Sequence, residues 1–333
     1  MRKKSGTMKN LSELLTPEIH SVGITGHMHP DGDCAGSVLA VYAYLTENFS
    51  GIRVDPYLDL PLSSEIEYLL SGEPVRSDEG KGEQYDLMII LDSATPDRLS
   101  AGKEAYKKAA HTVVIDHHET NPAYGDENYI DGNASSACEV LMRYMDIEKI
   151  SMRTAYCLYS GIIFDTNVFR YDATSPETLR DAALLIEKGV PFAEIIRESV
   201  MNRPLKVARV TAAVTEQAVL NEEDRFIYAI LDQEMLRSFG VTTSDIGGVV
   251  SELNTIREAE TTLLLYEFED GTWKASLRSK TKVDVSKIAA DLGGGGHVRA
   301  AGFSFSNTDP VEIVEKILAK VREQMQGGKE KHG

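Results

Sequence analysis

Acidic and imidazole side chains follow three short apolar runs in the first half of this chain. The runs are residues 22–25, 87–91 and 112–115. The polar residues that come after them are His27, Asp31 and Asp33, then Asp92, and finally Asp116, His117 and His118. Short apolar runs that end in this way are typical of buried strands in a parallel sheet, and ligands bind beyond the carboxyl ends of such strands. We therefore expect these side chains to share one edge of a sheet.

A divalent metal ion would explain why so many carboxylates gather at one edge. Without a cation, the carboxylates would repel one another and would be costly to bury. Asp165, at the end of a helix predicted over residues 152–164, adds a further carboxylate, and Gly32 is expected to free the backbone between Asp31 and Asp33. Mixed oxygen and nitrogen ligands suit Mn²⁺, with Mg²⁺ or Co²⁺ as alternatives. Each of these residues alone would also fit a helix cap or a turn. The metal site is predicted because all of them are expected at the same edge of the sheet.

Two ions would supply a specific kind of chemistry. A pair of ions ~3.5–4 Å apart can activate a water molecule and stabilise both oxygens of an in-line phosphoryl displacement. Asp92 stands alone at the end of its strand, where its two oxygens could bridge the ions. The pattern therefore favours metal-dependent hydrolysis of a phosphate ester.

The surrounding sequence predicts the elements that position these residues. Up to about residue 200, strands and helices alternate, which predicts an α/β domain with a parallel sheet. The helices expected there cover residues 34–49, 101–110, 152–164, 176–188 and 192–200, with a further strand at 52–58 and a helix capped by Ser135 or Ser136. We expect the domain to comprise residues 1–200.

A second, smaller α+β domain is predicted after residue 220. A helix over 204–220 lies in an expected linker region, 201–220, and the second domain would cover 221–326, with a flexible tail at 327–333. The expected strands are 226–231, 261–268, 272–278 and 302–305, and the expected helices are 285–292 and 310–325. Asp270 and Gly271 form a strong hairpin signal. We expect the active site to lie in the cleft between the two domains.

The glycine run at 293–296 predicts a substrate-binding segment in the second domain. Residues without side chains let backbone N–H groups approach a phosphate. The candidate substrate-binding residues are Arg278, Gly294, Gly295, Gly296, His297 and Arg299, of which the arginines and the histidine add positive charge. The alternative is a flexible loop between a helix and a strand.

Charge and composition narrow the class of protein. The 333 residues include 35 Lys and Arg against 52 Asp and Glu, a formal net charge of −17. A protein that grips long nucleic acid normally presents a cationic face, so we expect a small substrate. No apolar stretch is long enough to span a membrane. No apolar segment follows the basic residues 1–4, so we do not expect them to belong to a signal peptide. Three cysteines without CxxC spacing indicate reduced thiols and a cytoplasmic protein.

The motifs resemble those of the DHH phosphoesterases, which are named for an Asp-His-His sequence. In the first half, the matching segments are 27–33, 91–93, 116–118 and 164–166. In the second half, 276–279 and 293–302 resemble the glycine-rich DHH-associated domain. The resemblance spans about residues 20 to 325, and the compact two-domain form is most similar to the NrnA-type members. Those members hydrolyse RNA of two to five nucleotides and dephosphorylate 3′-phosphoadenosine-5′-phosphate (pAp).

The resemblance implies a role for each matching residue. One Mn²⁺ would be held by His27, Asp31 and Asp92, and the other by Asp33, Asp92, His117 and Asp165. Asp116 would orient His117 and fix its tautomer, and His118 would donate a hydrogen bond or a proton to the scissile phosphate. Two positions depart from the family pattern: Cys34 stands where Ala is usual, and Asn167 where Gly is common. We interpret Cys34 as a small packed residue rather than a reactive thiol.

Other functions share part of this pattern. A phosphodiesterase for cyclic or linear di-adenylate would use the same metal ligands. A RecJ-like exonuclease is disfavoured because no basic groove is evident, and a family II inorganic pyrophosphatase lacks the glycine-rich segment. A non-catalytic nucleotide-binding protein would be expected to have a broken ligand set, whereas this set is complete. Short RNA and pAp are the expected substrates. A homodimer is one of the oligomeric states that the sequence leaves open.

Overall fold

The computed structural model describes residues 10–63 and 65–327. It divides into two compact units, Met1–Asn202 and Arg203–Gly333. The basic residues 1–4 and almost all of the expected tail lie outside the described residues. In the described part of the chain, no helix is both long and apolar enough to cross a membrane.

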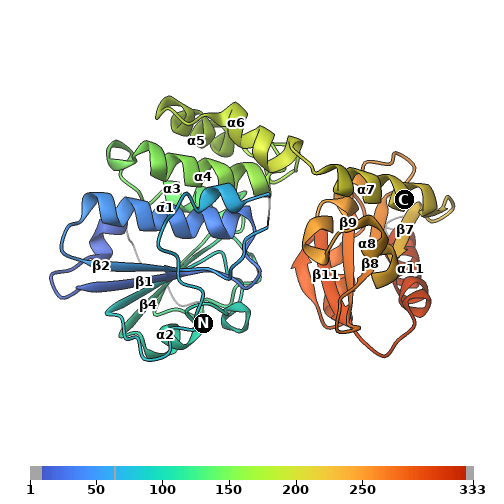
Figure 1. The fold of residues 1–333 in the computed structure, drawn as a ribbon, viewed down its shortest axis with the longest axis horizontal. Helices are drawn as coiled ribbons and strands as arrows, with labels where there is room; N and C mark the ends of the chain where they lie inside the picture. Colours follow the sequence, from blue (N-terminus) through green and yellow to red (C-terminus); the bar gives the residue numbers. More distant parts are fainter. Residues whose placement is uncertain (1–9, 64, 328–333) are drawn as a thin grey trace. The chain divides into compact units, whose positions relative to one another are not determined.

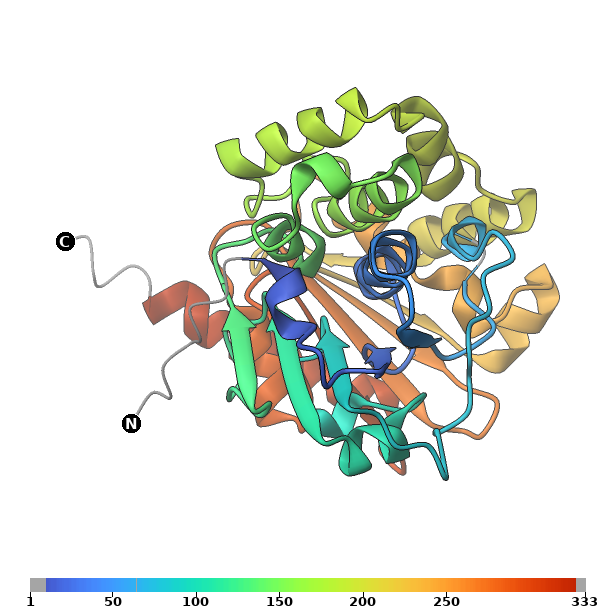
Figure 2. The same cartoon turned by 90° about the vertical axis from the view of Figure 1, so that its left-hand side faces the viewer.

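The first unit is built on a parallel sheet (Figure 1). Its main elements are β1 (Ser21–Thr25), α1 (Gly32–Asn48), β2 (Arg53–Tyr57), β3 (Leu87–Leu91), α2 (Lys103–Lys108), β4 (His111–Asp116), β5 (Glu127–Ile130), α3 (Ala137–Met142), α4 (Met152–Asp165), α5 (Pro176–Glu187) and α6 (Phe192–Ile196). The five described strands are in the order β2-β1-β3-β4-β5, and all pairs are parallel. Figure 2 shows β4 and β5, in green, side by side. The predicted α/β class with a parallel sheet is confirmed.

Helices cover both faces of this sheet, which explains why β3 is apolar throughout. Leu87, Ile89 and Leu91 belong to the core that includes α1, α3 and α4. Met88 and Ile90 alternate with them and pack on the opposite face, which α2 covers. A strand buried on both faces loses the polar alternation of a half-exposed strand. All five residues are almost completely buried.

Helices α1 and α4 pack closely because each has a glycine at the contact. A Cβ on Gly36 of α1 would lie 2.6 Å from the carbonyl oxygen of Cys157. A Cβ on Gly161 of α4 would lie 2.3 Å from Cys138 Sγ and 2.8 Å from Asp33 Oδ1. Neither position has room for a side chain, so these glycines let the two helices and α3 approach the polar edge of the sheet.

The edge strand β5 was not among the predicted elements. Its sequence, Glu127 to Ile130, is mostly polar and is only four residues long. It nevertheless pairs with β4 over the register Val113–Glu127 to Asp116–Ile130. Ser136, in contrast, accepts a hydrogen bond from the N–H of Glu139 as the N-cap of α3, as the sequence indicated.

The second unit has its own mixed sheet. Its elements are α7 (Leu205–Gln217), β6 (Val219–Asn221), β7 (Phe226–Leu231), α8 (Gln233–Phe239), α9 (Val249–Leu253), β8 (Thr261–Glu267), β9 (Trp273–Ser279), α10 (Val285–Asp291), β10 (Gly295–His297), β11 (Ala300–Phe305) and α11 (Pro310–Gly327). The strand order is β10-β11-β9-β8-β7-β6, with only β7 and β8 parallel among these pairs. Gly271 occupies the expected β8–β9 turn at φ +80°.

Four details of the second unit differ from expectation. Val210 and Val214 of α7, placed in a linker region by the sequence, are buried in a core with β7, α8 and α9. The helix also ends earlier than expected, because Val219 begins β6. The short helices α8 and α9 were not predicted. The glycine run 293–296 is not a free loop, since its second half belongs to β10.

Candidate metal centre

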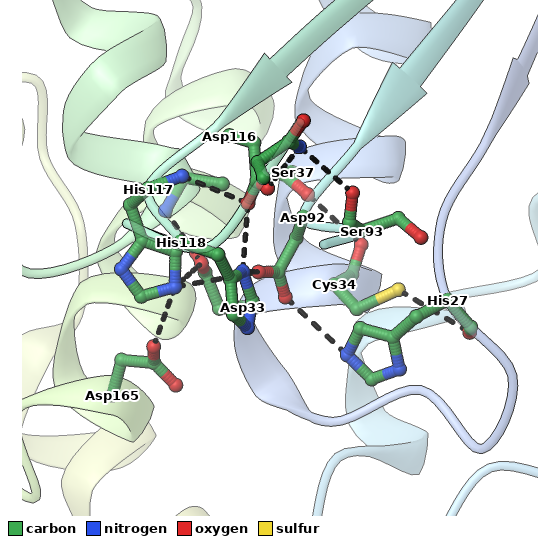
Figure 3. Close-up of polar contacts among 12 residues, drawn as sticks. His27, Asp33, Cys34, Ser37, Asp92, Ser93, Asp116, His117, His118 and Asp165 are labelled. Carbon is green, nitrogen blue, oxygen red and sulfur yellow. Dashed lines mark hydrogen bonds and ion pairs between the residues drawn. The ribbon is translucent and has the colours of Figure 1, made fainter. Parts of the chain in front are cut away.

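Asp92 lies at the centre of the polar side chains at the carboxyl edge of the first sheet (Figure 3). It follows β3 directly and is only 2% exposed. Its Oδ2 lies 3.4 Å from Nε2 of His27, and its Oδ1 lies 3.4 Å from Nε2 of His117. The two oxygens of one carboxylate therefore face two separate imidazoles, as a carboxylate that bridges two cations must do.

The backbone at Asp92 is held in an unusual conformation. Its φ is +49°, in the left-handed region that non-glycine residues seldom adopt. Its N–H still donates to the carbonyl oxygen of Ile115, which continues the pairing of β3 with β4. Strained backbone of this kind is concentrated at functional sites, where the surrounding structure maintains it.

One group of potential ligands surrounds Asp92 Oδ2. Nδ1 of His27 lies 2.9 Å from the carbonyl oxygen of Met28, so the ring donates there and its Nε2 is left as the ligand atom. Asp31 Oδ2 is 3.7 Å from the same Nε2, while Asp31 Oδ1 caps α1 by accepting the N–H groups of Asp33 and Cys34. Asp31 thus combines a cap with a ligand position.

A second group surrounds Asp92 Oδ1. Nε2 of His117 lies 3.3 Å from Oδ2 of Asp165 and 3.9 Å from Oδ2 of Asp33. Asp33, His117 and Asp165 offer ligand atoms that all lie within 4.8 Å of one another, although they come from α1, the segment after β4 and the end of α4. The structure therefore brings every predicted metal ligand to one edge of the sheet, and the assignment of these ligands to two ions stays a prediction.

Asp33 is also bound to the first turn of α3. Its Oδ2 accepts the N–H of Ala137 at 2.6 Å, and its Oδ1 accepts the N–H of Cys138 at 3.0 Å. The carboxylate is fully buried. The start of α3 therefore fixes the orientation of this ligand, while further lone pairs of each oxygen remain for a cation.

The electrostatics of this cluster fit a bound cation. Burial, together with the negative charge of Asp92, raises the pKa of Asp33 to about 7. Burial, with repulsion from Asp33, also raises the pKa of Asp165 well above its ordinary value. Burial opposes ionisation of Asp92 too, but its polar contacts with His117 and His27 hold its pKa well below the usual range. Among the described residues, Asp92 Oδ1 is buried and accepts no hydrogen bond, which a cation would remedy.

Asp116 contacts a different ring from the one that we expected. Its Oδ1 accepts the backbone N–H of His117 at 2.8 Å and lies 2.8 Å from Nδ1 of His118. The structure therefore corrects the expected orientation of the His117 ring by Asp116: this carboxylate orients the ring of His118 and positions His117 through its backbone. With Nδ1 of His118 engaged, Nε2 is the atom that can face a substrate.

The structure changes the reason given for Gly32 and agrees with the interpretation of Cys34. A Cβ on Gly32 would lie 2.5 Å from the side chain of Phe164, so this glycine is required for packing rather than for a special backbone angle. Cys34 is buried, its Sγ occupies the space that a Cβ on Gly26 would need, and burial raises the pKa of its thiol. Its role as a packed residue agrees with this geometry. Asn167 adopts φ +47°, which explains why glycine would also suit this position.

The candidate substrate-binding residues of the second unit have local roles of their own. Arg299 donates to the carbonyl oxygens of Val283 and Thr281. A Cβ on Gly294 would lie 2.2 Å from the carbonyl oxygen of Gly302, whereas a Cβ on Gly295 would meet nothing within 4 Å. Gly296 pairs with β11 at φ +138°, Arg278 Nη1 donates to the carbonyl oxygen of Leu277, and His297 is exposed at the end of β10. Their contact with a substrate stays a prediction.

Sequence reasoning did not single out Asn121. Its Nδ2 donates to Oδ2 of Asp116 at 2.6 Å and to the carbonyl oxygen of Ser93 at 3.1 Å. The only available signal was its position three residues after His118, because side-chain direction in a loop has no periodic pattern.

Comparisons with known proteins agree with this fold. Residues 21–162 match the model for the DHH family, N-terminal domain, and residues 223–327 match the DHHA1 domain. A structure titled as an exopolyphosphatase-related protein from Bacteroides fragilis has a similar fold, with a TM-score of 0.84, 22% identity, and coverage of 93% of this chain and 94% of that one. The chain belongs to the DHH family of phosphoesterases.

Two curated relatives match along nearly their whole lengths. A protein of Streptococcus mutans named probable bifunctional oligoribonuclease and PAP phosphatase NrnA is 30% identical over 296 residues, which is 87% of this chain and 92% of that protein. The bifunctional oligoribonuclease and PAP phosphatase NrnA of Thermus thermophilus is 27% identical over 320 residues, 96% of this chain and 94% of that protein.

Proposed function

We propose that this protein is a Mn²⁺-dependent hydrolase that cleaves RNA of two to five nucleotides to mononucleotides and converts pAp to AMP. The observation that carries the proposal is Asp92, whose two oxygens face His27 and His117. The names of the relatives in Streptococcus mutans and Thermus thermophilus supply the substrate class. Mg²⁺ or Co²⁺ would fit the same oxygen and nitrogen ligands.

The residues divide into two sets of ligands and one group that acts on the substrate. His27, Asp31 and Asp92 would hold one ion, and Asp33, Asp92, His117 and Asp165 the other. Bound ions at these positions would lower the pKa of a water molecule and neutralise charge on the phosphate. Burial raises the pKa of Asp33 and of Asp165, and a bound cation would favour the ionised form of both.

His118 is the proposed proton donor to the leaving group. Asp116 holds its Nδ1 at 2.8 Å, so that Nε2–H can point towards a phosphate ester. Water adds its oxygen to phosphorus and releases one proton to solvent, the bond from phosphorus to the ribose oxygen breaks, Nε2–H protonates that oxygen, and the His118 ring then regains a proton from solvent. Proton donation of this kind contributes about 10²–10⁴-fold to a rate. The products are a phosphomonoester, or phosphate, and an alcohol.

The second unit is proposed to bind the remainder of a short substrate. Arg278, His297 and the N–H groups of the glycine run are the candidate contacts, together with Arg299. Arginine binds phosphate in a bidentate, geometrically demanding way. A long nucleic-acid strand would gain little binding energy from a protein of net charge −17, so short substrates are favoured.

A hydrolysis panel tests this function. Purified protein with Mn²⁺ would be offered pAp, a dinucleotide, linear and cyclic di-adenylate, a 24-mer RNA and pyrophosphate. We expect the dinucleotide and pAp to be hydrolysed and the 24-mer to be cleaved far more slowly. Preference for cyclic di-adenylate would replace the proposal with a cyclic dinucleotide phosphodiesterase. Equal rates on the 24-mer and the dinucleotide would contradict it.

A further inference from the structure

Asn121 forms the outer end of a hydrogen-bonded chain that reaches the DHH histidine. Its Nδ2 donates to Asp116 Oδ2 at 2.6 Å, and Asp116 Oδ1 lies 2.8 Å from Nδ1 of His118. Each carboxylate oxygen of Asp116 therefore has a separate partner. Asp116 is completely buried, so its Oδ2 has no contact with bulk water while Asn121 is in place.

The orientation of the Asn121 amide is determined by a second contact. Its Oδ1 accepts the N–H of Ala123 at 2.9 Å, and its own backbone N–H donates to the carbonyl oxygen of His118 at 3.1 Å. A flipped amide would place an oxygen against the carboxylate of Asp116 and an NH₂ group against the N–H of Ala123. The NH₂ group therefore must face Asp116.

The same NH₂ group also joins two loops of the site. Besides Asp116, Nδ2 donates to the carbonyl oxygen of Ser93 at 3.1 Å, and Ser93 is the neighbour of Asp92. Tyr124 Oη donates to this carbonyl oxygen as well, at 2.9 Å. The NH₂ group of Asn121 thus links Ser93, in the segment after β3, to Asp116, the last residue of β4.

We propose that Asn121 is a positioning residue for proton donation by His118. It acts through Asp116: by fixing Oδ2, it keeps Oδ1 directed at Nδ1 of His118 and so keeps Nε2–H directed at the leaving oxygen. This inference rests on the proposed function, because it needs His118 to protonate the leaving group. Asn121 is not one of the proposed metal ligands, and its proposed role is limited to protonation of the leaving oxygen.

Leaving-group dependence separates this role from a structural one. A ribose oxygen needs a proton when it leaves, whereas a p-nitrophenolate does not. We would compare a dinucleotide with the p-nitrophenyl ester of a 5′-nucleotide, both with Mn²⁺. For Asn121→Ala, we expect kcat on the dinucleotide to fall about 10–100-fold, the range found when an orienting partner is removed, and kcat on the p-nitrophenyl ester to change little. The ratio of the two rates is independent of how much of the preparation is folded.

Two further variants serve as controls, and a third gives a second test of Asn121. Asn128→Ala removes two hydrogen bonds to Gly125 in the adjacent segment and should leave the ratio unchanged. Tyr124→Phe removes the other donor to Ser93 but not the contact with Asp116, so the ratio should again be unchanged. Asn121→Asp keeps the shape but places a second carboxylate against Asp116, and should lower the ratio even if Asn121→Ala is insoluble.

Coupling to His118 completes the test. In a His118→Ala background, Asn121→Ala should cause no further loss on the dinucleotide, because residues that act in one unit are not additive. Mn²⁺ titration by calorimetry should give the same stoichiometry and affinity for wild type and Asn121→Ala. Equal losses on both substrates, or additive losses with His118→Ala, would overturn the proposal. Failure of the wild type to hydrolyse either substrate would instead reject the proposed function.

Discussion

Arg299 Nη1 donates a hydrogen bond of 2.9 Å to the backbone carbonyl oxygen of Val283. The guanidinium also donates to the carbonyl oxygen of Thr281. On the other side of this loop, the buried carboxylate of Glu260 accepts the N–H groups of Thr281 and Lys282. Arg299 therefore binds carbonyl groups of the loop between β9 and α10, and Glu260 binds N–H groups of the same loop.

This contact predicts a stability effect for Arg299→Ala. Removing the guanidinium takes its donor from the carbonyl oxygen of Thr281 and leaves that of Val283 with Ser279 Oγ as its remaining side-chain donor, so we expect the free energy of unfolding to fall by about 1–3 kcal/mol. Urea denaturation monitored through Trp273 in β9 would measure the change, with Arg237→Ala on the exposed face of α8 as the control. Unchanged stability with a raised KM for the dinucleotide would show that Arg299 serves the substrate instead.

Asp92→Asn should abolish activity while leaving the fold intact. Asparagine tolerates the left-handed backbone at this position better than alanine does, so the variant tests the carboxylate alone. Because one Asp92 oxygen faces each group of ligands, Mn²⁺ binding should weaken at both. Calorimetry would measure the stoichiometry, and Asp97→Asn, an exposed carboxylate in the same segment, would be the control. Two tightly bound ions in the variant would disprove the bridging role.

His117→Ala and His118→Ala should have different defects. Nε2 of His117 lies between Asp92 and Asp165, so its loss should weaken metal binding, and excess Mn²⁺ should restore part of the activity. His118 is bound to Asp116 through Nδ1, so its loss should leave metal content unchanged and lower kcat by about 10²–10⁴-fold. Equal loss of metal from both variants would refute this division.

The two glycines of the run should respond differently to alanine. A Cβ on Gly294 would collide with the carbonyl oxygen of Gly302 and with Phe303, so Gly294→Ala should lower the melting temperature. A Cβ on Gly295 meets no atom within 4 Å, so Gly295→Ala should fold normally. A raised KM in Gly295→Ala would support approach of a phosphate to this segment; an unchanged KM would argue against it.

Asp181→Asn should change how stability depends on pH. Burial, followed by repulsion from Glu139, raises the pKa of Asp181 to about 6, whereas the pKa of an unfolded aspartate is about 3.9. The folded state then binds more protons between these values, so this residue lowers stability as the pH rises from about 4 to about 6. The variant should therefore be more stable than wild type at about pH 8 but not at about pH 4. Thermal melts at both values, with Glu187→Gln as control, would measure this; a gain independent of pH would contradict it.

The sequence predicted the elements whose side chains have one simple periodicity. β1, β3 and β4 are apolar because both faces of the sheet are covered, and that property is visible in any short window. β5 was missed because it is a short, polar edge strand whose pairing with β4 is decided by tertiary contact. The helix α8 has local signals, since Asp232 caps its start and Gly240 ends it in the left-handed region, but it is only seven residues long and α9 only five.

Within the site, the sequence indicated which residues gather but not how they contact one another. The ligands were recognisable because they follow predicted strands or end a predicted helix. The bond from the N–H of Ala137 to Asp33 joins residues 104 positions apart, and no local pattern reports it. Likewise, the choice of Asp116 between the rings of His117 and His118 depends on loop geometry. Packing against Phe164, rather than turn formation, explains Gly32, and this too required the structure.

The close packing of α1 on α4 has a consequence for the energetics of metal loading. Asp33 near the start of α1 and Asp165 at the end of α4 belong to helices that leave no room for a Cβ at Gly36 or Gly161. The two carboxylates cannot move apart beyond the range of side-chain rotation unless the helices themselves separate. A cation bound by both carboxylates would therefore stabilise the packing of α1 on α4. The free energy of unfolding would then rise with the logarithm of the free metal concentration. Starvation for metal would then reduce the lifetime of the folded chain as well as its turnover.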